Sequence, residues 1–288
     1  MNFGHGRHSI RTDRSRKNKM TSAIVRTEAL FERHPARDKR RFREVIVFVH
    51  NYGGNRHTFH RHIEFVNELG FDAITFDLPA SNVTELPRFP LSREWRFGLR
   101  HLWADKIEDV LGSIADEKFI FSFSYGSIAA LMAIYRRHAI DIKGWICDGG
   151  PFKHMQRAIE HFVNEGLFTV PILGHDLISQ NPMFRLPAFR RSVAIFAAGI
   201  FGRAHYDEDA DCALKSLPKG FPVLSLQATA DTLVQPDMID ELFAAGFGQI
   251  DLQKSMLPHS RHLTGMKDDA DPYKMFVESF LRARATPV

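Results

Sequence analysis

Residues 118–128 read Lys-Phe-Ile-Phe-Ser-Phe-Ser-Tyr-Gly-Ser-Ile, an apolar run followed by a serine, a glycine and a helix-forming stretch. This pattern predicts a strand over Phe119–Ser124 that turns sharply into a helix, with Ser124 at the corner. In such a nucleophile elbow the serine hydroxyl is exposed at the carboxyl end of a sheet, in front of a helix N-terminus. The corner has room only for small residues two positions either side of the serine. Ser122 and Gly126 meet that requirement.

The composition is typical of a soluble globular protein: 44% of the 288 residues are hydrophobic and 25% are charged. Cys147 and Cys212 lie far apart and predict no disulfide framework, which is typical of a reducing compartment. No stretch approaches the roughly 20 apolar residues that span a bilayer. Residues 1–22 also lack the apolar segment of a secretion signal. We therefore expect a cytoplasmic protein, and the sequence leaves its oligomeric state open.

The charge is unevenly distributed along the chain. Residues 1–43 carry 13 Lys and Arg against 4 Asp and Glu, whereas the remainder carries 25 against 30. The basic segment has no interleaved aromatic residues and no recognisable nucleic-acid motif. We interpret residues 1–43 as a solvated, partly disordered arm without a specific nucleic-acid partner. A weak alternation over Thr21–Phe31 predicts an edge strand within it.

Beyond the arm, apolar runs typical of strands alternate with helical stripes. Strands are predicted at Glu44–His50, Phe71–Asp77, Phe119–Ser124, Gly144–Cys147, Val223–Gln227 and Ile250–Met256. Helices are predicted at Asn55–Leu69, Trp103–Ile114, Ile128–Tyr135, Met238–Ala245 and Tyr273–Arg284, and residues 78–101 are predicted to be loop. This alternation predicts an α/β fold with a mainly parallel central sheet flanked by helices. Ligands of such sheets bind at the carboxyl ends of the strands.

Residues 152–220 interrupt the alternation, because one helix would suffice between the strands on either side. The segment holds apolar runs at Gly166–Leu173 and Ser192–Phe201. We predict a helical lid or cap insertion here, with residues 44–151 and 221–288 forming the core. Extra helices packed on the flank of the sheet are the alternative.

A serine hydroxyl becomes nucleophilic only when a base removes its proton and an acid orients that base. With a nucleophile elbow the expected chain order is serine, then acid, then histidine, each following a strand. Asp231 follows the strand Val223–Gln227, and His262 lies between the last strand and the last helix. Asp148 remains an alternative acid and His259 an alternative base.

The segment His50-Asn51-Tyr52-Gly53-Gly54, the elbow and the order of the three candidates resemble the α/β-hydrolase superfamily over residues 44–284. That resemblance implies an oxyanion hole formed by the backbone N–H groups of Tyr52 and Tyr125. Asn51 and Ser122 replace glycines of the family pattern, which indicates a divergent subfamily. Asparagine is among the few non-glycine residues that tolerate positive φ, so Asn51 need not break the loop.

The resemblance and the candidate residues together predict a serine hydrolase that cleaves a small-molecule carboxylic ester or thioester without a cofactor. The apolar character of the insertion, from Phe162 onward, predicts that part of it lines an apolar acyl pocket. The alternatives are a non-catalytic binding protein on the same fold, or a peptidase or carbon–carbon bond hydrolase with the same three residues. His57, His60 and His62 predict no metal site, because His62 points away from the others on a helix and no carboxylate or cysteine completes the set.

Overall fold

A computed structural model of the chain describes residues 30–79, 93, 94, 96, 98–164, 183, 186, 189, 192 and 205–288. The chain divides into two units, residues 1–30 and 31–288, and the description below concerns the second. The predicted edge strand at Thr21–Phe31 and both apolar runs of the predicted lid lie almost wholly outside the described residues. None of the helices in the described part is long and apolar enough to cross a membrane.

The described residues form a seven-stranded sheet with the strand order β1-β3-β2-β4-β5-β6-β7. The strands are β1 (Glu32–His34), β2 (Val45–Val49), β3 (Asp72–Thr75), β4 (Lys118–Phe123), β5 (Ile142–Asp148), β6 (Phe221–Ala228) and β7 (Ile250–Leu257). Only β1 runs antiparallel to its neighbour in this sheet, and the other pairs are parallel. The carboxyl ends of β2 to β7 therefore share one edge, where loops can bring distant side chains together.

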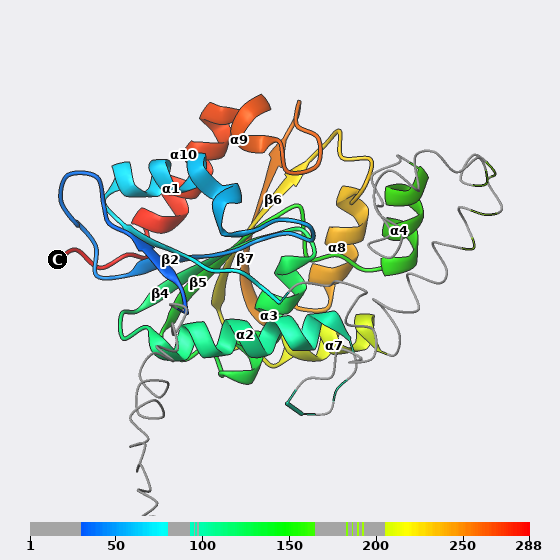
Figure 1. Ribbon diagram of the computed structural model, residues 1–288, viewed down its shortest axis with the longest axis horizontal. Helices are drawn as coiled ribbons and strands as arrows, with labels where there is room; N and C mark the ends of the chain where they lie inside the picture. Colours follow the sequence, from blue (N-terminus) through cyan, green and yellow to red (C-terminus); the bar gives the residue numbers. More distant parts are fainter. Residues whose placement is uncertain are drawn as a thin grey trace, which may run out of the picture. The chain divides into compact units, whose positions relative to one another are not determined.

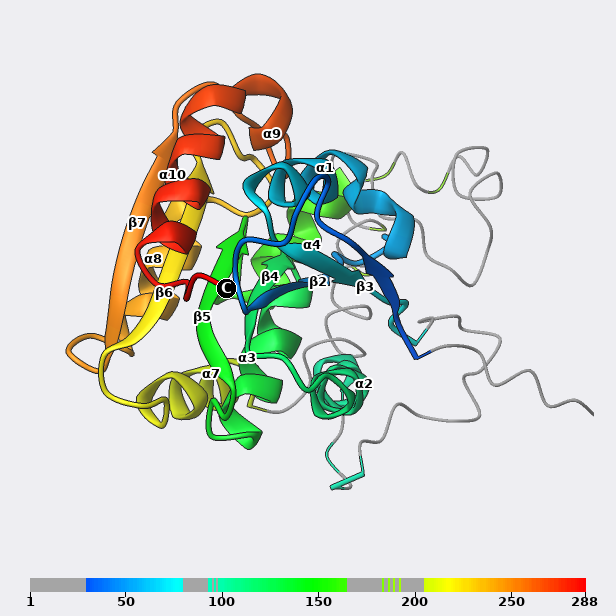
Figure 2. The ribbon, with the colours of Figure 1, turned by 90° about the vertical axis from the view of Figure 1, so that its left-hand side faces the viewer.

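Helices cover both faces of this sheet (Figures 1 and 2). One face carries η1 (Arg56–Phe59), α1 (His60–Leu69), α9 (Gly265–Asp268) and α10 (Ala270–Arg282). The opposite face carries α2 (Leu99–Ser113), α3 (Gly126–Arg136), α7 (Tyr206–Lys215) and α8 (Pro236–Ala244). All five residues of β2 are buried, as expected for a strand covered on both sides. The predicted mainly parallel sheet flanked by helices is confirmed.

Several boundaries differ from those predicted. β1 lies within the segment interpreted as a basic arm, and α2 begins at Leu99, inside the predicted loop. α7 belongs to the segment predicted as an insertion, yet Tyr206, Ala213 and Leu214 are buried and the helix packs against α3 and α8. This part of the insertion is therefore a flanking helix. The other helix of the insertion that the structure describes is α4 (Met155–Asn164).

The elbow predicted at residues 122–126 is a tight corner. Ser124 directly follows β4 with a φ of 48°, in the left-handed region that non-glycine residues rarely adopt. A Cβ atom on Gly126 would lie 2.2 Å from the His50 carbonyl oxygen, so only glycine lets the start of α3 approach β2 so closely. Ser122, fully buried, accepts a hydrogen bond from the Trp145 indole N–H at 2.7 Å. The hydroxyl at this position therefore has a structural partner that glycine would lack.

We expect Ser122→Ala to destabilise the fold by about 1–3 kcal/mol, because it leaves the indole N–H of Trp145 buried without that acceptor. Urea unfolding would measure the loss. The double variant with Trp145→Phe should cost less than the sum of the two single changes. Ser113→Ala, at an exposed serine, is the matched control and should change stability by no more than about 0.5 kcal/mol. Equal effects at positions 122 and 113 would contradict this account.

Candidate active site

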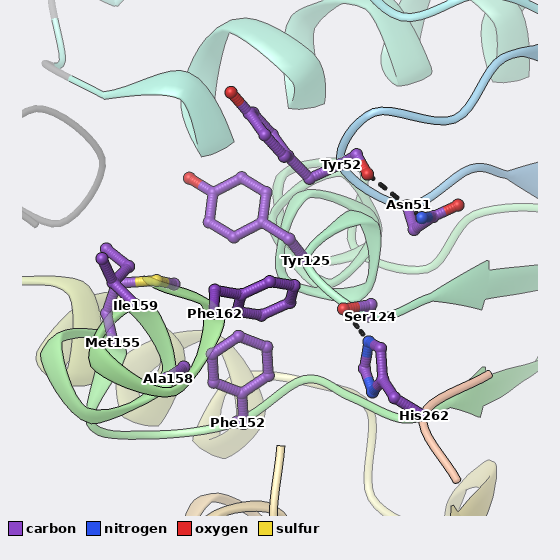
Figure 3. A pocket seen from close by; sticks show the side chains of 10 residues that line it. All are labelled: Asn51, Tyr52, Ser124, Tyr125, Phe152, Met155, Ala158, Ile159, Phe162 and His262. Atoms are coloured by element: carbon purple, nitrogen blue, oxygen red, sulfur yellow. Dashed lines mark hydrogen bonds between the residues drawn. The ribbon is translucent and has the colours of Figure 1, made fainter. Parts of the chain in front are cut away.

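Ser124, His262 and Asp231 meet at the carboxyl edge of the sheet, although they come from three separate loops. The Nε2 atom of His262 lies 2.9 Å from the Ser124 hydroxyl, and its Nδ1 atom lies 2.7 Å from a carboxylate oxygen of Asp231 (Figure 3 draws the first of these contacts). A carboxylate only accepts hydrogen bonds, so Nδ1 carries the imidazole proton and Nε2 presents its lone pair to the serine. The arrangement is able to accept a proton from Ser124.

Asp231 is oriented by its own loop. One carboxylate oxygen accepts hydrogen bonds from the backbone N–H groups of Leu233 and Val234, both at 2.9 Å, which leaves the other to face His262. The Asp231 side chain is 1% exposed and that of His262 is 11% exposed. The acid is thus shielded from water, while the imidazole keeps access to the space in front of the serine.

Among the described residues, the side chains of the alternative acid and base make no hydrogen bond to Ser124 or His262. His259 is exposed on the surface. Asp148, at the end of β5, is buried and accepts a hydrogen bond from the Tyr273 hydroxyl at 2.8 Å. In the structure His262, rather than His259, contacts the serine, and Asp231 contacts His262.

The three histidines near the start of α1 do not form a cluster. His57 and His60 are exposed, whereas the His62 ring packs edge-on against Phe123 and lies 3.1 Å from the Tyr273 hydroxyl. Burial, with a smaller contribution from the charge of Arg61, lowers the pKa of His62 to about 4, so this ring is neutral. Within the ranges that the structure describes, no group of three His, Cys, Asp or Glu side chains could hold a metal ion.

His50 fixes the loop that follows β2. Its Nδ1 lies 2.9 Å from the Asn51 carbonyl oxygen, and its Nε2 accepts a hydrogen bond from the Leu78 backbone N–H at 3.0 Å. Because an amide N–H can only donate, Nε2 is the acceptor and the proton lies on Nδ1. Burial lowers the pKa of His50, which favours this neutral form. The loop that carries Tyr52 is thereby held to the end of the neighbouring strand.

Asn51 fits this loop for a reason other than the one expected. The left-handed conformation occurs at Gly53, with a φ of 77°, and not at Asn51. The Asn51 amide donates to the Tyr52 carbonyl at 3.1 Å, and its Oδ1 lies only 2.7 Å from where a Cβ on Gly54 would be. Asn51 therefore does not need the tolerance of positive φ that asparagine offers, and it is accommodated because Gly54 leaves space for its side chain.

An apolar pocket opens beside the serine, with a volume of about 590 Å³ counting its mouth (Figure 3). Tyr52 and Tyr125, the two expected oxyanion residues, lie on its wall. The remaining lining comes from Asn51, Ser124, Phe152, Met155, Ala158, Ile159, Phe162 and His262. Four of these side chains form an i, i+3, i+4, i+7 stripe on α4, so the helix turns its apolar face to the pocket. Of this stripe only Phe162 was anticipated, although the spacing from Met155 is visible in the sequence.

The helix α4 also contacts the base and the loop of the acid. The Phe162 ring stands edge-on to the His262 ring, with 6.0 Å between centroids. His161 approaches the Leu233 carbonyl oxygen through Nδ1 at 3.3 Å, and Leu233 is one of the residues whose N–H orients the acid. One helix thus forms one wall of the pocket and contacts both His262 and the loop that carries Asp231.

Comparisons with known proteins agree with this architecture. No protein-family model matches the chain, and a search of curated proteins gives no significant match. Among solved structures, an esterase of Pyrococcus furiosus is 12% identical with a TM-score of 0.58, over 84% of this chain and 82% of the other. MenH from Staphylococcus aureus is 16% identical with a TM-score of 0.56, over 88% and 98%.

An α/β hydrolase from a Medee basin deep-sea metagenome library is 14% identical with a TM-score of 0.54, over 88% of this chain and 93% of the other. At these identities the likeness concerns the fold. The chain has the α/β-hydrolase fold that its sequence motifs predict.

Gly149 offers a test of how closely the position of His262 is controlled. A Cβ atom on Gly149 would lie 3.2 Å from the His262 Cε1 atom, and the residue has a φ of 61°. Gly149→Ala should destabilise the fold by about 1–2 kcal/mol through the left-handed backbone. The imidazole must also give way by a few tenths of an ångström, so kcat of a reaction that uses His262 should fall, by less than the roughly 10²-fold that a shift of 1 Å costs.

The matched control is Gly220→Ala, because Gly220 has a φ of 77° and nothing within 4 Å of its Cβ position. The control should show the same loss of stability, measured by urea unfolding, with kcat unchanged. A Gly149→Ala variant with the kcat of the control would show that His262 tolerates displacement.

Proposed function

We propose that the protein is a serine hydrolase that cleaves a carboxylic ester or thioester through an acyl-enzyme on Ser124. One observation carries the proposal: a serine at a strained strand–helix corner contacts a histidine whose other nitrogen contacts a buried aspartate, beside an apolar pocket. The α/β-hydrolase fold supports it, because the nucleophile in that fold occupies the same corner.

In this proposal His262 takes the proton of Ser124 through Nε2 as the hydroxyl oxygen attacks the substrate carbonyl. Asp231 orients the ring through Nδ1–H and stabilises the imidazolium cation. The proton then moves from Nε2 to the leaving oxygen or sulfur, and the acyl group stays on Ser124. Water, deprotonated by the same imidazole, releases the acid in the second half of the reaction.

We assign the developing oxyanion to the backbone N–H groups of Tyr52 and Tyr125. Both residues border the pocket beside the serine, and Tyr125 directly precedes α3. The N-terminus of that helix carries a partial positive charge, which favours a negative oxygen there. In a comparable site the loss of one such donor costs roughly 3–4 kcal/mol of transition-state stabilisation.

We propose an apolar acyl group as the part of the substrate that the pocket binds. Phe152, Met155, Ala158 and Ile159 are buried and present carbon and sulfur surface to it. Such a wall binds hydrocarbon by removing apolar surface from water, and it offers little to a charged group. We also propose that α4 is part of a lid over the serine.

Replacing the three residues tests the proposed chemistry. With p-nitrophenyl butyrate, Ser124→Ala and His262→Ala should each lower kcat on the order of 10⁶-fold, because residues of a triad act as a unit. Asp231→Asn should lower kcat on the order of 10⁴-fold by holding the imidazole in the wrong tautomer. Steady-state kinetics and circular dichroism of each variant separate lost catalysis from lost folding.

His259→Ala is the matched control, since it removes an exposed histidine of the same loop and should leave kcat unchanged. Hydrolysis by Ser124→Ala at the wild-type rate would reject the proposal. Hydrolysis that survives Asp231→Asn and is lost in Asp148→Asn would move the acid to the end of β5.

The pocket wall on α4 makes a prediction about acyl length. Ala158→Leu should fill space beside the serine and lower kcat/KM for p-nitrophenyl octanoate roughly ten- to hundredfold relative to the acetate. Gln156→Leu places the same leucine side chain on the exposed face of the helix and should leave the ratio unchanged. A ratio that is the same in both variants would remove α4 from the acyl site.

A further inference from the structure

A second buried carboxyl group lies next to the proposed catalytic residues and takes no part in the reaction outlined above. Asp148 ends β5, and its backbone carbonyl accepts a hydrogen bond from the Ser124 N–H at 2.8 Å. The following residue, Gly149, packs against the His262 ring. Asp148 is therefore next to both the nucleophile and the base in space, although it hydrogen-bonds neither side chain.

Asp148 is the end of a buried hydrogen-bonded chain. The Tyr273 hydroxyl of α10 donates to its carboxylate at 2.8 Å, and the His62 Nε2 of α1 lies 3.1 Å from the same hydroxyl. The Tyr273 hydroxyl has one proton and donates it to Asp148, so the His62 N–H must donate to the tyrosine oxygen. The chain thus directs two successive hydrogen bonds toward the carboxylate, a pattern that favours its ionised form.

The charges around Asp148 act in opposite directions. Burial raises the pKa of Asp148 to about 6, and the Asp231 charge adds to that rise. The Tyr273 hydrogen bond and a positive charge on His262 lower the same pKa. The titratable groups that face the carboxyl are Tyr273 from α10, His62 of α1 through that tyrosine, Asp231 and His262 from the loops after β6 and β7, and Cys147 on β5.

A structural role alone does not account for a carboxyl group at this position. When folding raises the pKa of a carboxyl, the folded state binds the proton of that carboxyl more tightly than the unfolded state does. The ionised group therefore lowers the stability of the fold as the pH rises above the pKa of the unfolded chain, and the loss is complete above about pH 6. An uncharged residue that accepts the Tyr273 hydrogen bond would avoid that loss. Perturbed groups of this kind gather at functional sites, because a charge that is costly to bury acts strongly on its neighbours.

We propose that Asp148 is a second carboxylate that stabilises the protonated imidazole of His262 during turnover, and that Tyr273 keeps this carboxylate charged. The inference rests on the proposed function. Asp231 orients the ring through contact, whereas Asp148 acts on it through charge without a hydrogen bond. Asp148 is a positioning residue in this scheme, since it touches neither substrate nor the reacting atoms.

The decisive variant is Asp148→Asn, which keeps the shape and the acceptor for Tyr273 and removes the charge. The acidic limb of the kcat/KM profile should move to lower pH by about one unit, since the imidazole then loses its proton more readily. The plateau kcat should fall about tenfold with KM unchanged, because the imidazolium formed in the reaction is less stabilised. Stability at pH 8 should be equal to or above that of the wild type.

Tyr273→Phe tests the second half of the proposal. Loss of the Tyr273 hydrogen bond raises the pKa of Asp148, so the carboxyl is neutral near pH 6 and charged near pH 9. The kcat of Tyr273→Phe should therefore equal that of Asp148→Asn near pH 6 and that of the wild type near pH 9. Wild-type kinetics at every pH would reject the role of Tyr273. Asp72→Asn, at a buried carboxyl at the start of β3, is the matched control and should leave the profile unchanged.

NMR titration of the His262 imidazole in the wild type and in Asp148→Asn separates this inference from the proposed function, because it needs no substrate. A lower titration midpoint in the variant supports the charge coupling even if the protein hydrolyses no ester. An unmoved midpoint and an unmoved acidic limb would overturn it. A variant inactive at every pH would also overturn it, by making Asp148 the orienting acid.

Discussion

The contact between Gly126 and the His50 carbonyl oxygen is the constraint on which the site depends. It lets α3 begin directly against the end of β2, at a separation that a residue with a Cβ atom at position 126 would not allow. Ser124 is then forced into its left-handed conformation, with its hydroxyl above the sheet edge. The same contact brings the loop that carries Tyr52 beside the serine. The proposed nucleophile and the proposed oxyanion loop are thus positioned by one close approach of two backbones.

Around that corner the site is built from loops that are each fixed by their own hydrogen bonds. Asp231 is oriented by two backbone N–H groups of its loop, and His50 holds the loop after β2 to Leu78. Because Asp231 is held by hydrogen bonds within its own loop, its contact with His262 requires little further ordering. The helix α4 then closes one side of the space in front of the serine with an apolar wall.

The sequence predicts much of the fold, because buried parallel strands and amphipathic helices leave local patterns. It also predicts a set of candidates at the sheet edge, since each lies in the loop after a strand and parallel strands end at one edge, but it leaves Asp148 and His259 open as alternatives. The start of α2 was predicted wrongly, because packing overrides local composition there. How Asn51 fits its loop depends on the space beside Gly54, which the sequence does not show.

The hydrogen-bonded chain behind Asp148 could not be predicted from one sequence. It joins residues 125 and 211 positions apart, and neither partner of Tyr273 belongs to a motif. His62 was interpreted as a residue that points away from its neighbouring histidines. The structure adds where it points, into a cluster of phenylalanines and onto a tyrosine. Pairings across such distances arise only from the tertiary packing of α1 and α10.

The central claim is that the surroundings of Ser124 make its hydroxyl a nucleophile. Incubation of the protein with a fluorophosphonate, followed by intact-mass measurement and peptide mapping, tests that claim without knowledge of the substrate. The account predicts a single adduct on the peptide that contains Ser124, absent from Ser124→Ala and from His262→Ala. No adduct on the folded wild-type protein, or an adduct on another serine, would contradict it.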